Sequence, residues 1–371
     1  MKRRSRKPSK SAQQWKSNLD EAYKAAVMVT QGETTGQIAV NIFGSKSTAC
    51  LNRVSSLLKL AEREGLFSLA GQLDVKTAAK LQAWCDNPEM KLHVVKNDHL
   101  AYSGKVAVDE AMRADAVARK AAEVVAERIA KLLHKFRHHK NRRIVVANAG
   151  GYAVSRIVHF LASHRTVPEE TNPRQLDFIS LNSASMPTDY GRSANTLAVR
   201  MAEIYGGSHI ALCPIWPQHI ADQYQRAVSN IDLLICGAGS NQSILFTWLR
   251  QHAGVNLPDD AVGDICLIPI SRDGHEVPLD ETSRANLNAR VDLQPSYSDL
   301  HSLAGRNGVI FVPMGFLSAS APDNPAGSSP EHSKLAVTRA ILKHSLAHTC
   351  ILGNSLAQAL IESSEIPAPD A

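Results

Sequence analysis

The chain has 371 residues, of which 44% are hydrophobic and 20% are charged; this composition is typical of a globular protein with room for one large and one small domain. Aromatic residues make up only 5%, which disfavours a surface that binds nucleic acid by stacking on its bases. The net charge of +6 at pH 7 equals the number of Lys and Arg residues among the first ten, so the rest of the chain is close to neutral.

The pattern of cysteines and apolar residues bears on where the protein works. The six cysteines are scattered without CxxC spacing, which indicates free thiols in a reducing compartment. No run of about 18 apolar residues occurs, so no membrane span is expected. The basic start is followed by polar residues instead of an apolar segment, which disfavours a signal peptide. We therefore expect a cytoplasmic protein without a membrane partner.

Residues 1–18 are basic and polar, and we expect them to form a disordered arm. A mobile basic arm adds affinity for phosphates, so Arg3, Arg4 and Arg6 are candidate contacts to DNA. The alternative is a solvated terminus that has no partner.

Residues 19–70 have the apolar spacing of three short helices, with connections around residues 32–35 and 44–47. This arrangement predicts a helix-turn-helix domain, in which the second helix of the motif enters the major groove of double-stranded DNA. Polar side chains near the start of the third helix are the candidate DNA contacts: Lys46, Ser47, Asn52, Arg53 and Ser56. The alternative is a three-helix packing or dimerisation element.

Residues 71–365 are expected to form a larger, mostly parallel α/β domain, and residues 366–371 a frayed tail. A helix at 75–84, a strand at 92–95 and a long helix at 106–137 come first. Strands then alternate with helices, which is typical of a parallel sheet covered on both faces. The expected strands lie at 144–147, 177–181, 209–212, 233–236, 265–270 and 309–312, and the expected helices at 154–163, 194–205, 218–229, 243–252 and 335–345.

Glycine turns follow several of these strands. Gly150 and Gly151 lead into a helix that begins at Tyr152, and Gly237 and Gly239 follow a later strand. Backbone N–H groups at such a turn can hold an anion, and ligands of open α/β sheets gather at the carboxyl ends of the strands. The alternative for each turn is close packing of a helix on its strand. None of the turns has the GxGxxG pattern of a dinucleotide site, so no cofactor is expected.

The sequence offers little for catalysis or metal binding. His134, His138 and His139, and separately His344 and His348, have helical spacing but no third ligand nearby, so no metal site is expected. Asp264 is the only candidate acid or base, and we expect no catalytic residues and no enzyme activity.

The order of several motifs resembles the SorC family of sugar-responsive transcriptional regulators, from about Leu19 to Glu362. The first motif is the helix exit at residues 54–67, the second is Leu181-Asn182-Ser183 followed by residues 194–198, and the third runs from Asp232 to Ser240. The fourth is formed by residues 261–265 and 272–277, and the fifth by residues 334–342 and 357–361. The resemblance implies an effector domain with a fold like those of ribose-phosphate isomerases and glucosamine-phosphate deaminases. It also implies a homo-oligomer, dimer or tetramer, whose binding to operator DNA responds to a small sugar or sugar-phosphate effector. The family positions of the effector site fall on Gly151, Tyr152, Ala153, Asn182, Ser193, Asp264 and Lys334.

The sequence departs from the family pattern in the turn that holds the phosphate. Gly151-Tyr152-Ala153 stands where the family has a threonine-bearing glycine turn, which suggests a different effector or lost sensing. Two alternatives to the regulator remain: an isomerase- or deaminase-like enzyme on the same sheet, and an effector-binding module that no longer binds DNA.

Overall fold

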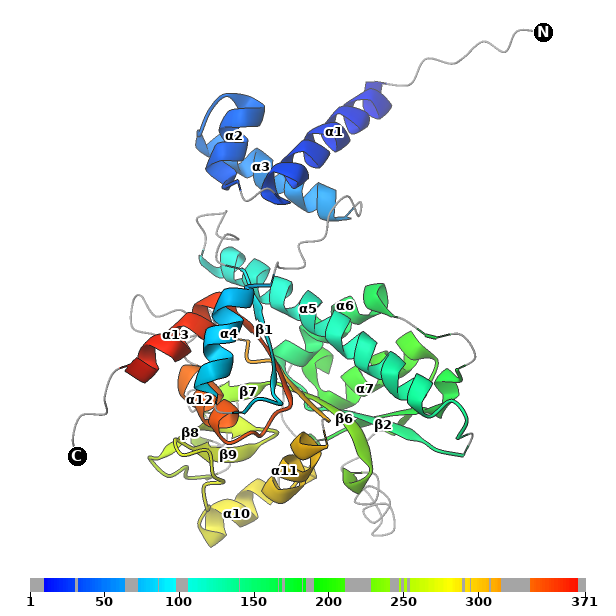
Figure 1. Ribbon diagram of the computed structural model, residues 1–371, viewed down its shortest axis with the longest axis vertical. Coiled ribbons are helices and arrows are strands. Elements are labelled where there is room, and N and C mark those ends of the chain that lie inside the picture. Colours follow the sequence, from blue (N-terminus) through cyan, green and yellow to red (C-terminus); the bar gives the residue numbers. More distant parts are fainter. Residues whose placement is uncertain are drawn as a thin grey trace. The chain divides into compact units, whose positions relative to one another are not determined.

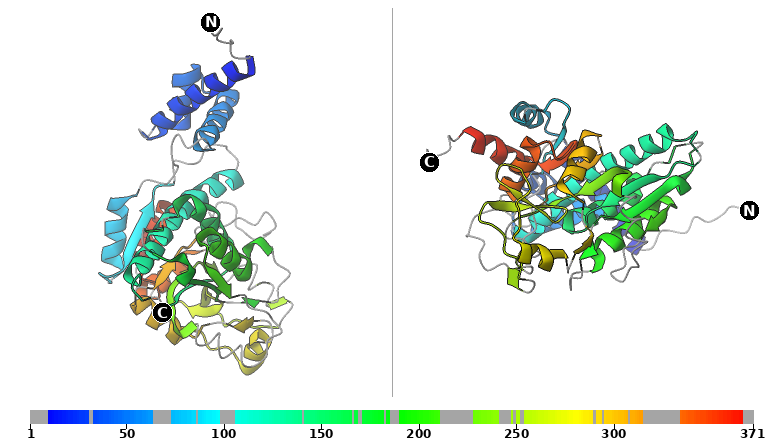
Figure 2. Two further views of the ribbon diagram at one scale, coloured as in Figure 1. Left: turned by 90° about the vertical axis from the view of Figure 1, so that its right-hand side faces the viewer. Right: turned by 90° about the horizontal axis from the view of Figure 1, so that it is seen from below.

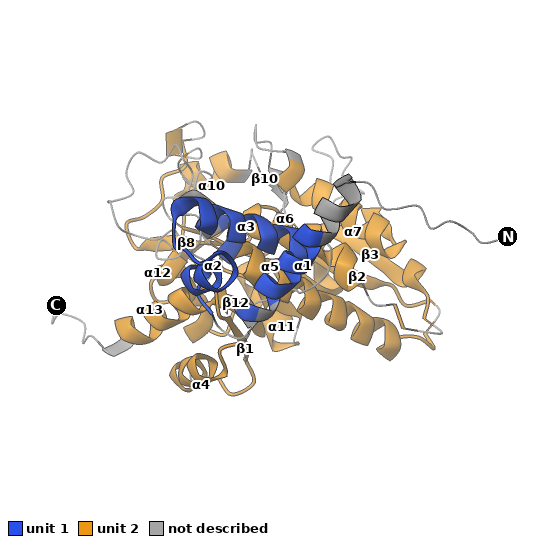
Figure 3. Ribbon diagram, turned by 90° about the horizontal axis from the view of Figure 1, so that it is seen from above, with its two compact units in different colours: residues 1–71, 98–113 blue, residues 72–97, 114–371 orange. Residues whose placement is uncertain are grey.

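The computed structural model describes residues 10–30, 33–63, 73–85, 87–97, 106–139, 141–165, 167–168, 171–181, 183–184, 190–210, 228–240, 247, 250–251, 254–288, 291–293, 295–306, 308–314 and 334–365. The chain divides into two compact units (Figure 3). The first comprises residues 1–71 and 98–113, and the second comprises residues 72–97 and 114–371.

The first unit is helical, with α1 (Lys10–Thr30), α2 (Thr35–Phe43) and α3 (Thr48–Arg63). Its core consists of small and aliphatic side chains from all three helices: Ala22, Ala25, Ala26, Ile38, Ala39, Val54, Leu57, Leu58 and Ala61. Residues 10–18, which we expected to be disordered, are helical, because residues 10–30 contain no Gly or Pro and several strong helix formers.

The two ends of α2 are set by local chemistry. Thr34 and Gln37 form a reciprocal capping box, in which each side chain accepts a hydrogen bond from the other residue's backbone N–H. Gly44 ends the helix at φ 70°, in the left-handed region that glycine adopts without a steric penalty. The four residues 44–47 then connect α2 to α3, which is the connection length of a helix-turn-helix motif.

The second unit is built on a seven-stranded sheet in which all neighbouring strands are parallel. The spatial order is β1-β12-β11-β6-β2-β3-β5. Figure 1 labels β1, β6 and β2 of this sheet. The strands are β1 (Lys91–Val95), β2 (Ile144–Asn148), β3 (Leu176–Ser180), β5 (Ser208–Ile210), β6 (Ile231–Cys236), β11 (Val309–Phe311) and β12 (Thr349–Gly353). This arrangement confirms the expected fold class, a helical N-terminal region followed by a mostly parallel α/β domain.

The strand order reverses once the chain has filled one side of the sheet. From β2 the chain builds outward through β3 to β5, and it then returns to β6 and builds the opposite way through β11 to β12. The neighbouring strands β2 and β6 therefore lead to helices or loops that diverge. This is the topological switch point of the sheet, where open α/β folds leave a crevice for ligands outside the carboxyl ends of the strands.

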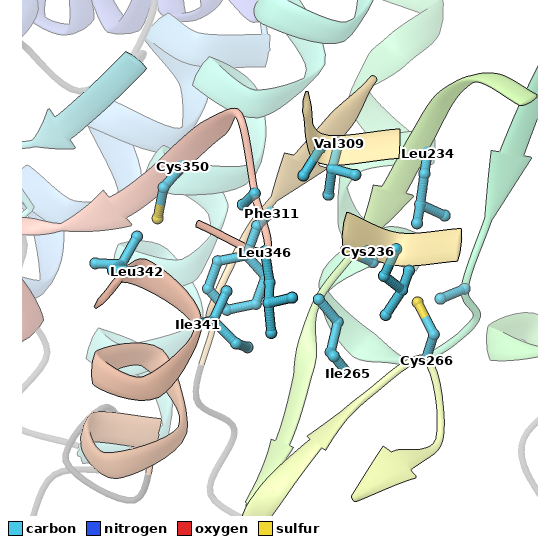
Figure 4. Close-up of a cluster of buried hydrophobic side chains, with 14 of the residues drawn as sticks. Leu234, Cys236, Ile265, Cys266, Val309, Phe311, Ile341, Leu342, Leu346 and Cys350 are labelled. Atoms are coloured by element: carbon cyan, nitrogen blue, oxygen red, sulfur yellow. The ribbon is translucent and has the colours of Figure 1, made fainter. Parts of the chain in front are cut away.

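Helices cover both faces of the sheet (Figure 2). Because side chains alternate along a strand, one face buries Ala147, Leu234, Phe311 and Leu352, among others, in one large cluster. Part of this cluster is shown in Figure 4, where the strand side chains meet Ile341, Leu342 and Leu346. The helices α4 (Val75–Trp84), α11 (Tyr297–Gly305), α12 (Leu335–Lys343) and α13 (Asn354–Glu365) contribute to it.

The opposite face is covered by the helices α6 (Tyr152–His164) and α7 (Ala194–Tyr205) together with the long helix α5 (Val106–Lys135). Phe178 of β3 packs against Tyr205 of α7, with ring centroids 5.9 Å apart. Arg156 of α6 forms a two-pronged ion pair with Asp115 of α5, with both N–O distances at 2.7 Å. The first contact joins α7 to the sheet, and the second joins α6 to α5.

Two further sheets are small and antiparallel. One contains β7 (Ala238–Ser240), β8 (Ala261–Ile265) and β9 (Ile268–Ser271), and the other pairs β4 (Ser183–Ala184) with β10 (Val291–Leu293). The remaining elements are the helix α10 (Glu281–Asn288) and the short helices η2 (Pro173–Gln175) and η3 (Tyr190–Arg192).

The prediction of a single strand at residues 265–270 was wrong. These residues form the hairpin of β8 and β9, and the turn is made by Cys266 and Leu267, with φ values of 52° and 69°. Two-residue hairpin turns are normally marked by Asn or Gly, and an all-apolar run hides such a turn from pattern analysis. The expected strands did not include β12, which lies in the interior of the sheet between β1 and β11. Most of the helices expected at 218–229 and 243–252, and the tail at 366–371, lie outside the described residues. In the part of the chain that the structure describes, no helix is both long and apolar enough to cross a membrane.

Candidate functional site

The carboxyl ends of β2 and β6 carry the glycine turns that we predicted as a ligand site. A Cβ atom on Gly150 would lie 2.7 Å from the carbonyl oxygen of Arg192 and 2.8 Å from the amide nitrogen of Ala194, so only glycine fits there. Gly151, at φ 99°, caps α6 and donates its N–H to the oxygen of Arg192 at 2.8 Å. The turn after β2 is thus closed by the residues just before α7.

The N-terminus of α7 completes this side of the site. Ser193 caps α7, and its hydroxyl oxygen accepts a hydrogen bond from the N–H of Thr196 at 3.2 Å. Asn148, the last residue of β2, is fully buried and donates to the carbonyl oxygens of Ile179 and Ala194, both at 3.2 Å. The side-chain amide nitrogen of Asn148 therefore links the start of α7 to the carboxyl end of β2. The side-chain oxygen of Asn148 has no hydrogen-bond partner among the described residues.

Tyr152 and Arg192 form the outer part of this turn. The guanidinium of Arg192 lies 5.3 Å from the centre of the Tyr152 ring, a distance at which a cation is attracted to an aromatic face. The phenol of Tyr152 and the guanidinium of Arg192 therefore lie together beside the glycine turn. The guanidinium adds a positive charge near the N-terminus of α6, which itself favours anions.

The second half of the site follows β6. Gly237 lies directly against Ala153 in the first turn of α6, because a Cβ atom on Gly237 would be 3.2 Å from that of Ala153. This contact joins the two glycine turns at the switch point. The chain then forms β7, which pairs with β8 so that Gly239 lies opposite Asp264.

Asp264 is a carboxylate in the interior of the domain. It is only 5% exposed, and one of its oxygens accepts the N–H of Leu267 at 3.0 Å. Its other oxygen, Oδ1, has no hydrogen-bond partner among the described residues. Burial raises the pKa of the Asp264 carboxyl, and the backbone N–H of Leu267, the charge of Lys334 and the backbone N–H of Gly239 oppose that rise.

Lys334 supplies the positive charge near this carboxylate. Its ammonium is buried and donates a hydrogen bond to the carbonyl oxygen of Ala238 at 2.6 Å. Burial lowers the pKa of Lys334, and the charge of Asp264 opposes that change. Burying a single carboxylate or a single ammonium costs free energy. The placement of both beyond the carboxyl ends of the strands therefore indicates a polar ligand site.

The hairpin that carries Asp264 is strained. Cys266 and Leu267 both adopt left-handed backbone conformations, which are costly for residues other than glycine. The turn presents the Leu267 N–H to the carboxylate of Asp264 and places the Cys266 thiol beside Cys236. Strained backbone that a fold maintains beside a buried charge is typical of a ligand site.

The structure brings eight of the nine predicted effector residues to the region beyond the carboxyl ends of β2 and β6. Gly150, Gly151, Tyr152 and Ser193 lie on the α6–α7 side, and Gly237, Gly239, Asp264 and Lys334 lie on the hairpin side. The ninth, Asn182, lies outside the described residues. Neither Asn148 nor Arg192 was among the predicted site residues. A polar residue at the end of the otherwise apolar β2 was a signal for Asn148, but no pattern marked Arg192.

The predicted DNA contacts lie on the helical unit. Lys46 and Ser47 are in the turn before α3, and Asn52, Arg53 and Ser56 are exposed on α3 itself. Arg53 is engaged within the unit: it donates to Glu21 and to Asn18, both at 3.1 Å. Arg3, Arg4 and Arg6 lie outside the described residues.

Comparisons with known proteins place the fold. No protein-family model matches the chain, and no curated protein matches it. Among solved structures, the full-length sorbitol operon regulator SorC from Klebsiella pneumoniae superposes with a TM-score of 0.52 at 17% identity, covering 93% of this chain and 99% of that one. A transcriptional regulator from Streptococcus pneumoniae (TM-score 0.54, 14% identity) and a probable sor operon regulator from Shigella flexneri (0.51, 16%) each cover 78% of this chain and 99% of their own.

These similarities confirm at the level of fold the resemblance inferred from the motifs. The two-part architecture, a helical N-terminal region and a mostly parallel α/β domain, is that of a full-length SorC regulator. The structural neighbours of this chain are transcriptional regulators of that kind.

Proposed function

We propose that this protein is a transcriptional regulator that binds operator DNA through its helical unit and changes that binding when a small anionic sugar-like effector occupies the switch point. Residues 19–70 would form the DNA-binding domain and residues 71–365 the effector domain. In keeping with the family that it resembles, the protein would act as a homo-oligomer.

The observation that supports the effector site most strongly is the buried pair of Asp264 and Lys334 beside the two glycine turns. An effector hydroxyl could donate to the unpartnered Oδ1 of Asp264, and an anionic group would be favoured by Lys334 and by the N-terminus of α6. A polyol that carries a phosphate or carboxylate matches this combination. The turn lacks the family's threonine, so a carboxylate-bearing sugar acid is as suitable as a sugar phosphate.

The DNA-binding proposal is supported by the geometry of α2, the turn at 44–47 and α3. The apolar side of α3 is buried in the unit, and its exposed side carries Asn52 and Ser56, with Lys46 in the turn before it. Side chains of this kind hydrogen-bond to base edges and phosphates.

The effector proposal is tested by thermal-shift measurements on the full chain with sugar phosphates, sugar acids and neutral sugars. We expect one of the anionic classes to raise the melting temperature of the wild type, and Lys334→Met and Asp264→Asn to abolish that rise. The matched control is Lys80→Met, at an exposed position on α4, which should respond as the wild type does. Stabilisation by neutral sugars alone, or equal stabilisation of all the variants, would count against the site.

The DNA-binding proposal is tested by fluorescence anisotropy with the DNA upstream of the protein's own coding sequence and a scrambled duplex of equal length. We expect preference for the upstream DNA, loss of the preference in Asn52→Ala/Ser56→Ala, and a change in affinity on adding the stabilising ligand. Equal binding to both duplexes would refute sequence-specific regulation through this DNA. Turnover of the ligand would support the alternative of an isomerase or deaminase.

A further inference from the structure

A second concentration of positive charge lies far from the N-terminal arm in the sequence. Residues 128–143 contain seven Lys or Arg residues and three His residues but no Asp or Glu. Outside this segment and the first ten residues, the chain has 28 Lys and Arg against 35 Asp and Glu. The net positive charge of the protein therefore resides in two short segments, and only the first is explained by the arm.

The fold exposes this second segment at the amino ends of the strands. The proposed effector site lies at the opposite, carboxyl ends. Ile129, Leu132 and Leu133 anchor the end of α5 in the core, which turns Lys131, His134 and Lys135 outward. The chain then leads from α5 into the amino end of β2 (Figure 1), and Arg174 of η2 precedes the amino end of β3. We call this surface the basic edge: Lys131, His134, Lys135, Arg137, His138, His139, Arg142, Arg143 and Arg174.

Carboxylates of the protein neutralise only part of the basic edge. Arg142 pairs with Asp232 at 2.6 Å, Arg143 with Asp177, and Lys131 with Glu127 at 3.7 Å. Among the described residues, Lys135, Arg137 and Arg174 form no ion pair with a carboxylate. Arg137 instead donates to ring nitrogens of His134 and His138. An arginine whose partners are two imidazoles retains its full positive charge for an external anion.

Phe136 organises the cations of the basic edge. The ammonium of Lys135 lies 5.1 Å from the centre of the Phe136 ring, and the guanidinium of Arg142 lies 4.9 Å from it. The edge of His139 also meets this ring, at 6.1 Å. These contacts restrain flexible cationic side chains, which lowers the entropy lost when they bind an anion. They also occupy the ring, so Phe136 is not available for stacking on a nucleic-acid base.

We propose that the basic edge is a second contact surface for DNA, which binds the phosphate backbone without reading sequence. The cations are spread over the end of α5, the following turn and η2 instead of converging in a pocket, and a polymer of regularly spaced phosphates fits that spread better than a single small anion does. The choice of DNA as the polyanion rests on the proposed regulator function. The surface itself rests on the charges and contacts given above.

The test compares two triple variants of the full chain that lose the same charge. Lys135→Gln/Arg137→Gln/Arg174→Gln removes the three cations of the basic edge that form no ion pair with a carboxylate in the described part of the chain. The matched control, Lys76→Gln/Lys80→Gln/Arg272→Gln, removes three exposed cations elsewhere in the same unit. Circular dichroism and thermal melts should show that both variants fold as the wild type does.

Binding to a random-sequence duplex is then measured over a series of salt concentrations. Each lost phosphate contact should reduce the magnitude of the slope of log affinity against log salt concentration by about 0.9. For the basic-edge variant we therefore expect this slope to fall by about 2 to 3 and the affinity at low salt to fall at least about tenfold. The control should stay within about twofold of the wild type. A basic-edge variant that behaves like the control would overturn the proposal.

Two further measurements distinguish DNA from other anions, and a third distinguishes the failure of this proposal from the failure of the proposed regulator function. Inorganic phosphate should compete with DNA only weakly; if it stabilises the wild type but not the basic-edge variant, and DNA binding is unchanged, the surface is a small-anion site and the proposal fails. Binding of polyglutamate, but not DNA, through the basic edge would also refute it. If upstream and scrambled DNA bind equally while the basic-edge variant still loses slope, the regulator function fails and the backbone contact stands.

Discussion

Asp264 and Lys334 are held against adjacent residues of one short strand. The backbone of Asp264 lies opposite Gly239 of β7, and the ammonium of Lys334 donates to the carbonyl oxygen of Ala238 in the same strand. Both side chains are buried, and the charge of each partly offsets the effect of burial on the pKa of the other. The proposed effector site is therefore also a point on which we expect the stability of the domain to depend.

Removing both of these charges should cost less than the sum of the two single removals. We expect Lys334→Met to lower the free energy of unfolding by about 3 kcal/mol, because it leaves a buried carboxylate without its cation. Asp264→Asn/Lys334→Met should be less damaging than the sum of the single variants, with a coupling of about 1 to 3 kcal/mol. Urea unfolding of the four proteins measures this cycle, and additive effects would show that the two charges are not coupled.

Gly150 and Gly305 provide a matched pair for the glycine turn. Gly150→Ala places a methyl group against the backbone of Arg192 and Ala194, so we expect a loss of about 1 to 3 kcal/mol and weaker ligand binding. Nothing lies within 4 Å of a Cβ atom on Gly305, at the end of α11, so Gly305→Ala should be neutral or stabilise by up to about 1 kcal/mol. Chemical unfolding measures both changes. Equal effects would contradict the close approach of the α7 segment to the turn.

The stability of the α/β unit should fall as the pH is lowered through about 6.5. Burial lowers the pKa of His344 from its ordinary value of 6.5, and the neighbouring His275, whose ring centre is 5.1 Å away, adds to the effect. Below pH 6.5 the unfolded chain therefore binds more protons at this residue than the folded chain does, and acid favours unfolding. The free energy of unfolding, measured from about pH 7.5 to 5.5, should decline less steeply in His344→Gln. An unchanged slope would show that His344 does not contribute.

Release of Arg53 from Glu21 should strengthen DNA binding. The pair is partly exposed, so Glu21→Gln should change the stability by no more than about 1 kcal/mol. A released Arg53 that reaches a phosphate would add about 0.9 to the salt slope of binding. Anisotropy titrations measure the slope, and the gain should disappear in Glu21→Gln/Arg53→Gln. A weaker affinity in Glu21→Gln would indicate instead that the ion pair positions α3 for DNA.

Chemical labelling should separate the cysteines by burial. Burial raises the pKa of the Cys350 thiol well above its usual value, and the neighbouring Cys236 does the same for Cys266. Because the thiolate is the reactive form, these residues should resist iodoacetamide in the folded protein, whereas the half-exposed Cys50 should react. Mass spectrometry of labelled peptides measures the difference, and rapid labelling of Cys266 would show that the strained hairpin opens.

The amino-acid sequence by itself determined the two-part architecture and most of the elements. Apolar periodicity marked the three N-terminal helices, and α4 and α7 begin and end at their predicted residues because local signals such as the Ser193 cap and Gly206 set their limits. Glycines after β2 and β6 marked the candidate site, because a turn that must approach another backbone closely excludes every side chain. These features are local, so a one-dimensional pattern contains them.

Only the tertiary structure decided which turns lie next to each other and which charged side chains form ion pairs. The switch point exists because β2 and β6 are neighbours although more than 80 residues separate them, and Lys334 reaches Ala238 from 96 residues away. The same is true of Arg53, whose hydrogen-bond partners lie on α1. It is also true of the basic edge, where, among the described residues, Arg142 and Arg143 pair with distant carboxylates and Lys135 and Arg137 pair with none. Electrostatic energy depends on distance in space, and the order of residues along the chain does not contain that distance.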